Sequence, residues 1–303
     1  MSAHADPLQG RLGPARLKMI VAATCRETGL DPTDATLIKF TNNAVFRLPR
    51  ESVVLRIAGS ATMRNRVTKV LQVTNWLAKH NFPAVRPLKS IEQPLLIDGD
   101  VVTLWKQVPE GGPPANGRHL GEILKQLHHI ADRPPMLPLW DPISSIRSRL
   151  DEAEILGAEN YARLLDVSSE IESDLSGLAY DLPPGLIHGD ATVANLITGN
   201  THPILCDFDA ASLGPREWDL TPVATGHLRF EPTGNNQSLI VEAYGFDITE
   251  WPGFSVLRRL RELQLVTSVL PVLQSNSSLQ PQWQHRLRTF LGKDTGQRWH
   301  LYG

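Results

Sequence analysis

The sequence GLIHGDATVANLI at residues 185–197, followed by PILCDFD at residues 203–209, is the most informative part of this 303-residue chain. Each stretch contains a short apolar run typical of a β-strand, followed by carboxylates: Asp190 in the first, Asp207 and Asp209 in the second. An ionised aspartate beside apolar residues is costly to bury unless it is paired or binds a metal. We therefore expect these carboxylates to belong to a functional site.

The spacing within these stretches favours phosphoryl transfer. Asn195 follows Asp190 by five positions, so a loop can return its amide oxygen toward the carboxylate, and Asp207 follows the next strand. Mg²⁺ prefers hard oxygen ligands and keeps several waters. A protein can therefore hold it with one carboxylate and one amide oxygen, while the substrate phosphates supply further ligands. The reaction also needs an aspartate that accepts the proton of the acceptor hydroxyl.

The residues before this region predict a small domain of mixed α and β structure. Short runs rich in Val, Leu, Ile and Phe predict antiparallel strands, and apolar residues at helical spacing predict helices. The turn Asp98-Gly99-Asp100 joins the last two strands as a hairpin. The predicted helices are residues 14–28 and 63–80, and the predicted strands are residues 35–40, 44–48, 52–58, 94–97 and 101–105.

The stretch PEGGPP at residues 109–114 opposes both helix and sheet hydrogen bonding, so it marks a domain boundary. Residues 1–108 form the first predicted domain. Residues 109–303 form the second, which is mostly helical apart from the strand-like stretch quoted above. Its predicted helices are residues 117–131, 143–156, 161–178, 251–273 and 281–291.

The composition excludes several classes of protein. The net charge of −2 gives no electrostatic reason to expect binding to nucleic acid or to an anionic membrane. No apolar run approaches the roughly 20 residues of a membrane span. Residues 1–10 lack the basic start and apolar core of a signal peptide, so we expect a cytoplasmic protein. Cys25 and Cys206 match no zinc or redox spacing and are expected to be reduced core residues.

Three motifs resemble the signatures of the aminoglycoside phosphotransferase and choline kinase-like family, which shares the protein-kinase fold. They are His-Gly-Asp-x-x-x-x-Asn at residues 188–195, Asp-Phe-Asp at residues 207–209 and GPREWDL at residues 214–220. In this order they are strongly specific, and the resemblance covers most of the chain. It implies a bilobal α+β fold, with a five-stranded antiparallel sheet plus a helix in the N-terminal lobe and a mostly helical C-terminal lobe.

The resemblance also implies roles for the residues of the quoted stretches. Asp190 is expected to be the catalytic base or to orient the acceptor hydroxyl, and Asn195 and Asp207 are expected to hold Mg²⁺ between the nucleotide phosphates. His188 is expected to brace the loop rather than react. Asp209 either orients the loop or the acceptor substrate, or it is a hydrogen-bonded strand end.

For the nucleotide, the family places a cation on the third strand against the phosphates, and Arg56 occupies that position. The alternative is an edge-strand arginine that reaches water. Asn43, with Thr41 and Asn42, is expected to form the turn over the phosphates. The backbone of Lys106 and Val108 is expected to face the purine edge, as in kinase hinges.

The sequence departs from the family in the helix after Arg56. That helix normally presents an acidic partner to the cation, but residues 62–75 contain no Asp or Glu. Two readings stay open: Gln72 is a neutral acceptor for Arg56, or Arg56 pairs only with phosphate. Asp219 is expected to cap a helix or brace a loop rather than to bind substrate.

These features predict a kinase that transfers the γ-phosphoryl group of ATP or GTP to a hydroxyl of an aminoglycoside, an amino sugar or a related small alcohol. Antibiotic resistance is one role for such an enzyme. The alternative is a nucleotide-binding pseudokinase scaffold without turnover, which the missing acidic partner of Arg56 suggests. A protein kinase is disfavoured because no activation segment follows Asp207. The oligomeric state stays open.

The acceptor is not identified by the acidic residues 141–181. This segment has ten acidic residues against three arginines, a net charge of −7. It either attracts a polyamine or an amino sugar or forms a solvated helix face, and the solvated face is the preferred interpretation. Four aromatic residues of the last third of the chain are expected to fill a helical core rather than to stack on a sugar: Trp251, Phe254, Trp283 and Trp299.

Overall fold

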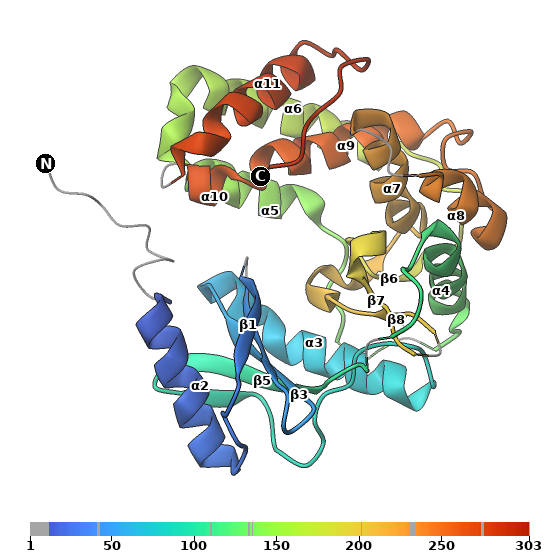
Figure 1. The fold of residues 1–303 in the computed structure, drawn as a ribbon. Helices are drawn as coiled ribbons and strands as arrows, with labels where there is room; N and C mark the ends of the chain where they lie inside the picture. The colour runs from blue at the N-terminus through green and yellow to red at the C-terminus, as the bar shows by residue number, and fades with distance from the viewer. Residues whose placement is uncertain are drawn as a thin grey trace, which may run out of the picture. The chain divides into compact units, whose positions relative to one another are not determined.

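The computed structural model describes residues 12–40, 43–109, 111–132, 134, 136–200, 202–230, 234–273 and 276–302. Their packing divides the chain, traced from blue to red in Figure 1, into two compact units. The first unit takes its described residues from Met1–Ala115, Asp132–Leu137 and Ala194–Ala211. The second takes them from Asn116–Ala131, Pro138–Val193 and Ser212–Gly303.

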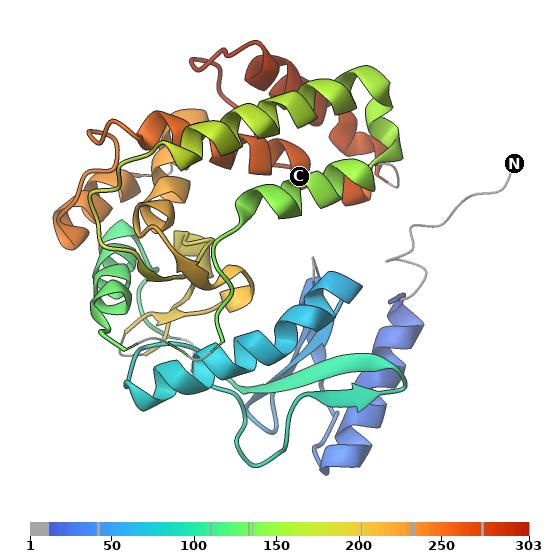
Figure 2. The ribbon, with the colours of Figure 1, turned by 180° about the vertical axis from the view of Figure 1, so that it is seen from behind.

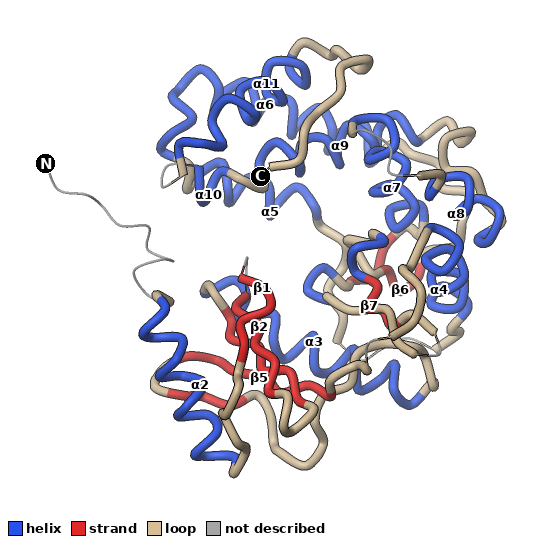
Figure 3. Tube along the Cα trace, viewed as in Figure 1, coloured by secondary structure: helices blue, strands red, loops and turns tan. Residues whose placement is uncertain are grey.

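The first unit is built on a five-stranded sheet (Figure 3). Every neighbouring pair is antiparallel, and the strand order is β1-β2-β3-β5-β4. The predicted small antiparallel sheet is therefore confirmed. The strands are β1 (Thr36–Phe40), β2 (Asn43–Leu48), β3 (Val53–Ala58), β4 (Leu95–Ile97) and β5 (Asp100–Lys106).

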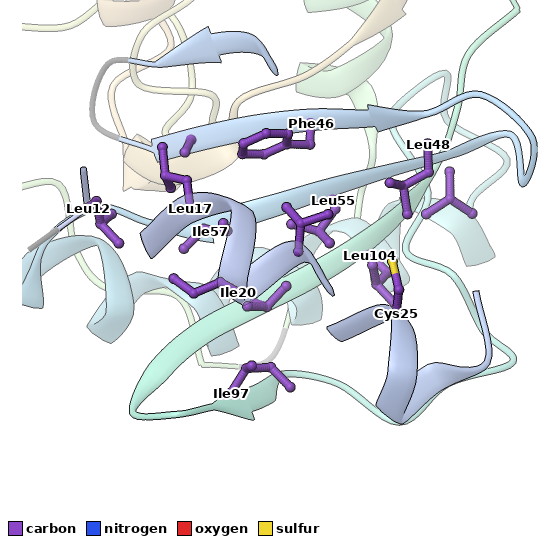
Figure 4. Packing of buried hydrophobic residues seen from close by; sticks show 14 residues of the cluster. Leu12, Leu17, Ile20, Cys25, Phe46, Leu48, Leu55, Ile57, Ile97 and Leu104 are labelled. Carbon is purple, nitrogen blue, oxygen red and sulfur yellow. The ribbon is translucent and has the colours of Figure 1, made fainter. Parts of the chain in front are cut away.

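Helix α2 (Pro14–Thr28) packs on one face of this sheet, and helix α3 (Ala61–Lys79) lies on the opposite side (Figures 1 and 2). Figure 4 shows apolar side chains of α2 against Leu55, Ile57 and other buried residues of the strands. Because side chains alternate along a strand, Arg56 of β3 projects from the face away from α2. The core on one face thus directs Arg56 to the other.

A hairpin distant in sequence completes the first unit. Strands β7 (Leu196–Ile197) and β8 (Ile204–Leu205) are antiparallel. Leu205 accepts a backbone hydrogen bond from Val85 at 3.0 Å and donates one to Pro83 at 2.9 Å, just after α3. These bonds assign the hairpin to the first packing unit although it follows residue 108. A two-domain division at residues 108 and 109 stays a prediction.

The second unit is mostly helical and contains one small antiparallel pair, β6 (Gly185–Ile187) with β9 (Ser212–Gly214). Helix α9 lies at its centre and packs against α5, α6, α7 and α11. The helices are α4 (Gly117–His129), α5 (Pro142–Asp151), α6 (Gly157–Ser176), α7 (Glu217–Arg229), α8 (Asn236–Tyr244), α9 (Phe254–Thr267), α10 (Leu270–Leu273) and α11 (Gln280–Leu291).

Three helices differ from the prediction. The helix predicted over residues 251–273 is broken after Thr267, because Pro271 has no N–H and its ring clashes with the carbonyl four residues earlier. Helices α7 and α8 are additional. Helix α7 is buried on nearly all sides and contains Pro222, so its sequence shows no amphipathic repeat.

The solvent exposure of several residues decides between the two interpretations that the sequence left for them. All ten acidic residues of 141–181 are exposed, as the solvated-face interpretation requires. The aromatic residues expected in the core are buried. Both cysteines are free thiols, and desolvation raises the pKa of Cys206 to about 12. None of the described helices is long and apolar enough to span a membrane.

Candidate active site

The loop that carries Asp190 is held through its backbone by Asp219 of α7. The buried carboxylate of Asp219 accepts the N–H of His188 at 2.6 Å and the N–H of Gly189 at 2.7 Å. Trp218 donates its indole N–H to the carbonyl of Gly189 at 2.9 Å. The expected loop-brace role of Asp219 is thus confirmed by its contacts.

The glycine and the histidine of this loop have separate structural roles. Gly189 has φ 85°, in the left-handed region that favours glycine. Nδ1 of His188 accepts the N–H of Asp190 at 3.3 Å, and the His188 side chain is buried. These contacts agree with a bracing role for His188.

Asp219 is itself oriented by two further side chains, His128 and Tyr244, which the sequence does not reveal. Nε2 of His128 on α4 lies 3.1 Å from the Asp219 carboxylate, and its Nδ1 lies 2.8 Å from the hydroxyl of Tyr244 on α8. Helices α4 and α8 approach closely because Gly121 has no Cβ. His128 lies within the helix predicted over residues 117–131, and no motif of the sequence analysis singles it out.

The carboxylate of Asp190 remains accessible. Its side chain is 46% exposed and pairs with Arg261 of α9, whose Nη2 lies 2.8 Å from Oδ1. A general base must lie within hydrogen-bond reach of the hydroxyl proton that it accepts. The exposed carboxylate meets the accessibility that this role requires. Sequence reasoning missed Arg261 because nothing near it resembles a motif.

The two residues predicted to bind metal lie at the same end of the β7–β8 hairpin. Asn195 directly precedes β7, and Cys206, which directly follows β8, donates its backbone N–H to the Asn195 carbonyl at 2.9 Å. Asp207 comes next. An amide oxygen and a carboxylate supplied from one hairpin end fit the hard-oxygen preference of Mg²⁺. Among the described residues, no group of three or more His, Cys, Asp or Glu side chains is placed to hold a metal ion.

The backbone at Asp207 is unusual. Its φ is 69°, in the left-handed region that non-glycine residues rarely adopt. The following side chain, Phe208, is buried and begins the short 3₁₀ helix Phe208–Ala210. Strained backbone of this kind clusters at functional sites, and here it lies between β8 and the segment that carries Asp209.

Arg56 has acidic partners after all, and they come from this segment. Its Nη2 is hydrogen-bonded to Oδ2 of Asp209 and lies 3.7 Å from Oδ1 of Asp207. Nδ2 of Asn43 on β2 donates to the same Asp209 oxygen at 3.3 Å. Both readings that replaced the missing acid by Gln72 or by phosphate alone are corrected by this finding. The alternative of an Arg56 that simply reaches water is excluded by its ion pairs.

Helix α3 contributes a lysine to the same segment. Nζ of Lys69 donates to the carbonyls of Asp209 at 2.8 Å and Ala211 at 3.0 Å. Burial lowers the pKa of Lys69 to about 8. Lys69 therefore anchors the segment that presents Asp209 to Arg56, a role that sequence reasoning missed.

The remaining nucleotide residues lie elsewhere in the first unit. Lys106 ends β5, and its backbone N–H donates to the carbonyl of Arg86 at 2.9 Å. Val108 follows in the loop. No described contact joins either residue to Arg56. Thr41 and Asn42 of the expected phosphate turn lie outside the described residues.

Comparisons with known proteins point the same way. A family model described as "Phosphotransferase enzyme family" matches residues 38–263. No curated protein matches the chain significantly. Among solved structures, the chain is similar to amicoumacin kinase hAmiN in complex with AMP-PNP, Ca²⁺ and Ami, at 13% identity over 97% of each chain with a TM-score of 0.71.

Two further solved structures show the same likeness. The choline kinase LicA from Streptococcus pneumoniae is 14% identical over 91% of this chain and 99% of that one, with a TM-score of 0.66. The streptomycin–ATP–APH(2″)-IIa ternary complex is 13% identical over 92% and 96%, with a TM-score of 0.57. At such identities the likeness concerns the fold, and it confirms the kinase-like α+β fold.

Proposed function

Because the chain belongs to the phosphotransferase enzyme family, we propose that it is a small-molecule kinase that transfers the γ-phosphoryl group of ATP or GTP to a hydroxyl of an aminoglycoside, an amino sugar or a related small alcohol. The observation that carries the proposal is the clamped loop, which fixes the backbone of Asp190 and leaves its carboxylate accessible. A rigidly held, exposed base suits the orientation of an acceptor hydroxyl.

On the nucleotide side, Arg56 is the proposed clamp on the phosphates, and Asn43 lies beside it through their shared partner Asp209. The carbonyl of Lys106 and the N–H of Val108 are the proposed purine contacts. Asn195 and Asp207 are the proposed Mg²⁺ ligands. When bound, Mg²⁺ supplies neutralisation of phosphate charge.

The pseudokinase alternative rests on an absent partner for Arg56, and the pairing with Asp209 removes that ground. Similar solved structures include an amicoumacin kinase, a choline kinase and an APH(2″)-IIa complex with streptomycin and ATP. They support a small-molecule acceptor. We also propose a role in antibiotic resistance and a location in the cytoplasm.

The test is the consumption of ATP and of GTP with Mg²⁺ against a panel of aminoglycosides, amino sugars and amino alcohols. We expect turnover with at least one acceptor, and Asp190→Asn should lower it by about 10²- to 10⁴-fold, the usual contribution of general base catalysis. Asp181→Asn, at an exposed position of the same unit, serves as the control and should leave turnover unchanged. Unaltered turnover in Asp190→Asn would contradict the assigned base.

A further inference from the structure

In the second unit, the carboxylate of Asp190 is paired with a cation, Arg261. Arg261 donates from Nη2 to Asp190 Oδ1 at 2.8 Å and from Nη1 to Oε1 of Gln264 at 3.2 Å. The Arg261 side chain is only 15% exposed. Among the ion pairs of the described residues, Asp190 is the single acidic partner of Arg261. The guanidinium is therefore held at the carboxylate that has to meet the acceptor.

This position constrains the acceptor. A hydroxyl within hydrogen-bond reach of Asp190 also brings its neighbouring carbon atoms close to Arg261. At such separations a substituent with positive charge is repelled by the guanidinium, and a carboxylate or phosphate is attracted. Planar Arg also binds these two groups through paired N–H donors, which a hydroxyl or an amine cannot exploit in the same way.

Apart from Asp190 itself, the acidic residues 141–181 do not offset this charge. The acidic residues 141–181 are all exposed, and several are engaged with other cations of the second unit. Glu170 pairs with Arg259 at 2.5 Å, and Glu172 pairs with Arg147 at 2.7 Å. The segment therefore forms a solvated, internally paired surface rather than a set of partners for an ammonium group next to Asp190.

We propose that Arg261 determines acceptor specificity, and that the acceptor carries a carboxylate or phosphate group next to the hydroxyl that is phosphorylated. This inference rests on the proposed function and narrows its acceptors to small alcohols that carry an anionic group, with any amino group away from the reacting hydroxyl. In the reaction, the hydroxyl oxygen forms the new bond to the γ-phosphorus, the bond to the leaving nucleoside diphosphate breaks, and the hydroxyl proton passes to Asp190.

The experiment uses matched acceptors. D-Glycerate, glyceramide and 3-amino-1,2-propanediol share one skeleton and are anionic, neutral and cationic; gluconate, gluconamide and 1-amino-1-deoxyglucitol form a larger set. Turnover with ATP and with GTP is measured for the wild type, Arg261→Gln and Arg261→Lys. Arg259→Gln is the control, since it removes the same charge from the same helix at the pair with Glu170.

We expect the wild type to prefer the anionic member of a set by about tenfold or more in kcat/KM. Arg261→Gln should lose this preference through a rise in KM for the anionic member, with the neutral member little affected. Arg261→Lys should keep the order at a smaller ratio, and Arg259→Gln should behave as the wild type. Equal use of anionic and neutral members, a preference for the amine, or a preference that survives in Arg261→Gln would each overturn the inference.

A second measurement separates this inference from the proposed function. Without nucleotide, glycerate and gluconate should raise the melting temperature of the wild type but not of Arg261→Gln. If this shift occurs and no acceptor is phosphorylated, the acceptor-site inference holds and the kinase proposal fails. If the amines are phosphorylated, the kinase proposal holds and the inference fails. If the anionic compounds are not phosphorylated and do not shift the melting temperature, the inference is also refuted.

Discussion

Among single residues, Asp209 is the most informative on the nucleotide side, because it pairs with Arg56 from 153 positions further along the chain. Both side chains are mostly buried, and Asn43 donates to the same carboxylate oxygen. The proposed phosphate clamp, Arg56, is thus neutralised within the protein itself. Removing the carboxylate leaves a largely buried positive charge without its nearest counter-charge.

Asp209→Asn should therefore lower the free energy of unfolding by about 1–3 kcal/mol in the nucleotide-free protein. The deficit should shrink when nucleotide phosphates supply the missing negative charge. Thermal denaturation with and without a non-hydrolysable nucleotide measures both effects. Asp166→Asn, an exposed substitution of the same kind, is the control and should change neither value. A deficit that persists unchanged with nucleotide counts against the phosphate clamp.

The residues of the site differ in how far the sequence predicts them. Asp190 and Asn195 lie in one local motif, and Asp207 follows on the next strand, so their order along the chain is enough to select them. The partners Asp209 for Arg56 and Arg261 for Asp190 depend on tertiary packing across 153 and 71 positions. No local pattern encodes such a pair, because either side chain alone is a common surface residue.

Among elements, the contact between α4 and α8 supports the loop of Asp190 from a distance. A Cβ built at Gly121 would lie 2.9 Å from Cβ of Ala243 and 3.0 Å from the carbonyl oxygen of Ile240. The close approach brings Tyr244 to His128, which orients Asp219. One glycine on a helix face thus contributes to the geometry of the loop that carries Asp190.

Gly121→Val should destabilise the protein by about 1–3 kcal/mol, because the added methyl groups force two tightly packed helices apart. It should also lower turnover more than nucleotide affinity, since Asp219 loses its oriented partner. Chemical denaturation and steady-state kinetics give the two readouts. Gly226→Ala in α7 is the counterpart: its Cβ meets nothing within 4 Å, so helix propensity should stabilise the protein by up to about 1 kcal/mol. Equal effects of both substitutions would contradict the packing argument.

The elements also show where periodicity fails. Strands β2 and β3 and helix α2 are predicted within one or two residues, because each buries one face more deeply than the other. Helix α7 is buried on nearly all sides, so its sequence has no polar face to reveal it. Its interior Pro222 also argues against a helix in any single-sequence reading.

In the whole molecule, the proposed nucleotide contacts and the proposed base come from different packing units. Arg56, Asn195 and Asp207 lie in the first unit, and Asp190 lies in the second. Binding of the nucleotide and activation of the acceptor should therefore be separable by substitution.

Arg56→Gln should weaken ATP or GTP binding by about 10- to 100-fold, the value of lost charge-assisted hydrogen bonds to phosphate. Asp190→Asn should leave nucleotide affinity nearly unchanged while it abolishes most turnover. Titration calorimetry with Mg²⁺ and each nucleotide provides the comparison, with circular dichroism to establish that both variants are folded. Comparable losses of affinity in the two variants would show that the roles are not divided in this way.

The hairpin of β7 and β8 has a consequence for how the protein folds during its synthesis on the ribosome. The chain passes between the two packing units after residues 115, 131, 137, 193 and 211. The first unit therefore stays incomplete until residue 211 has emerged from the ribosome, long after its own sheet has been synthesised. Much of the second unit is synthesised before the first unit is complete. A nascent chain stalled at residue 108 holds the sheet and Arg56 but neither of the proposed Mg²⁺ ligands, so under the proposed function nucleotide binding arises late in translation rather than with the first folded layer.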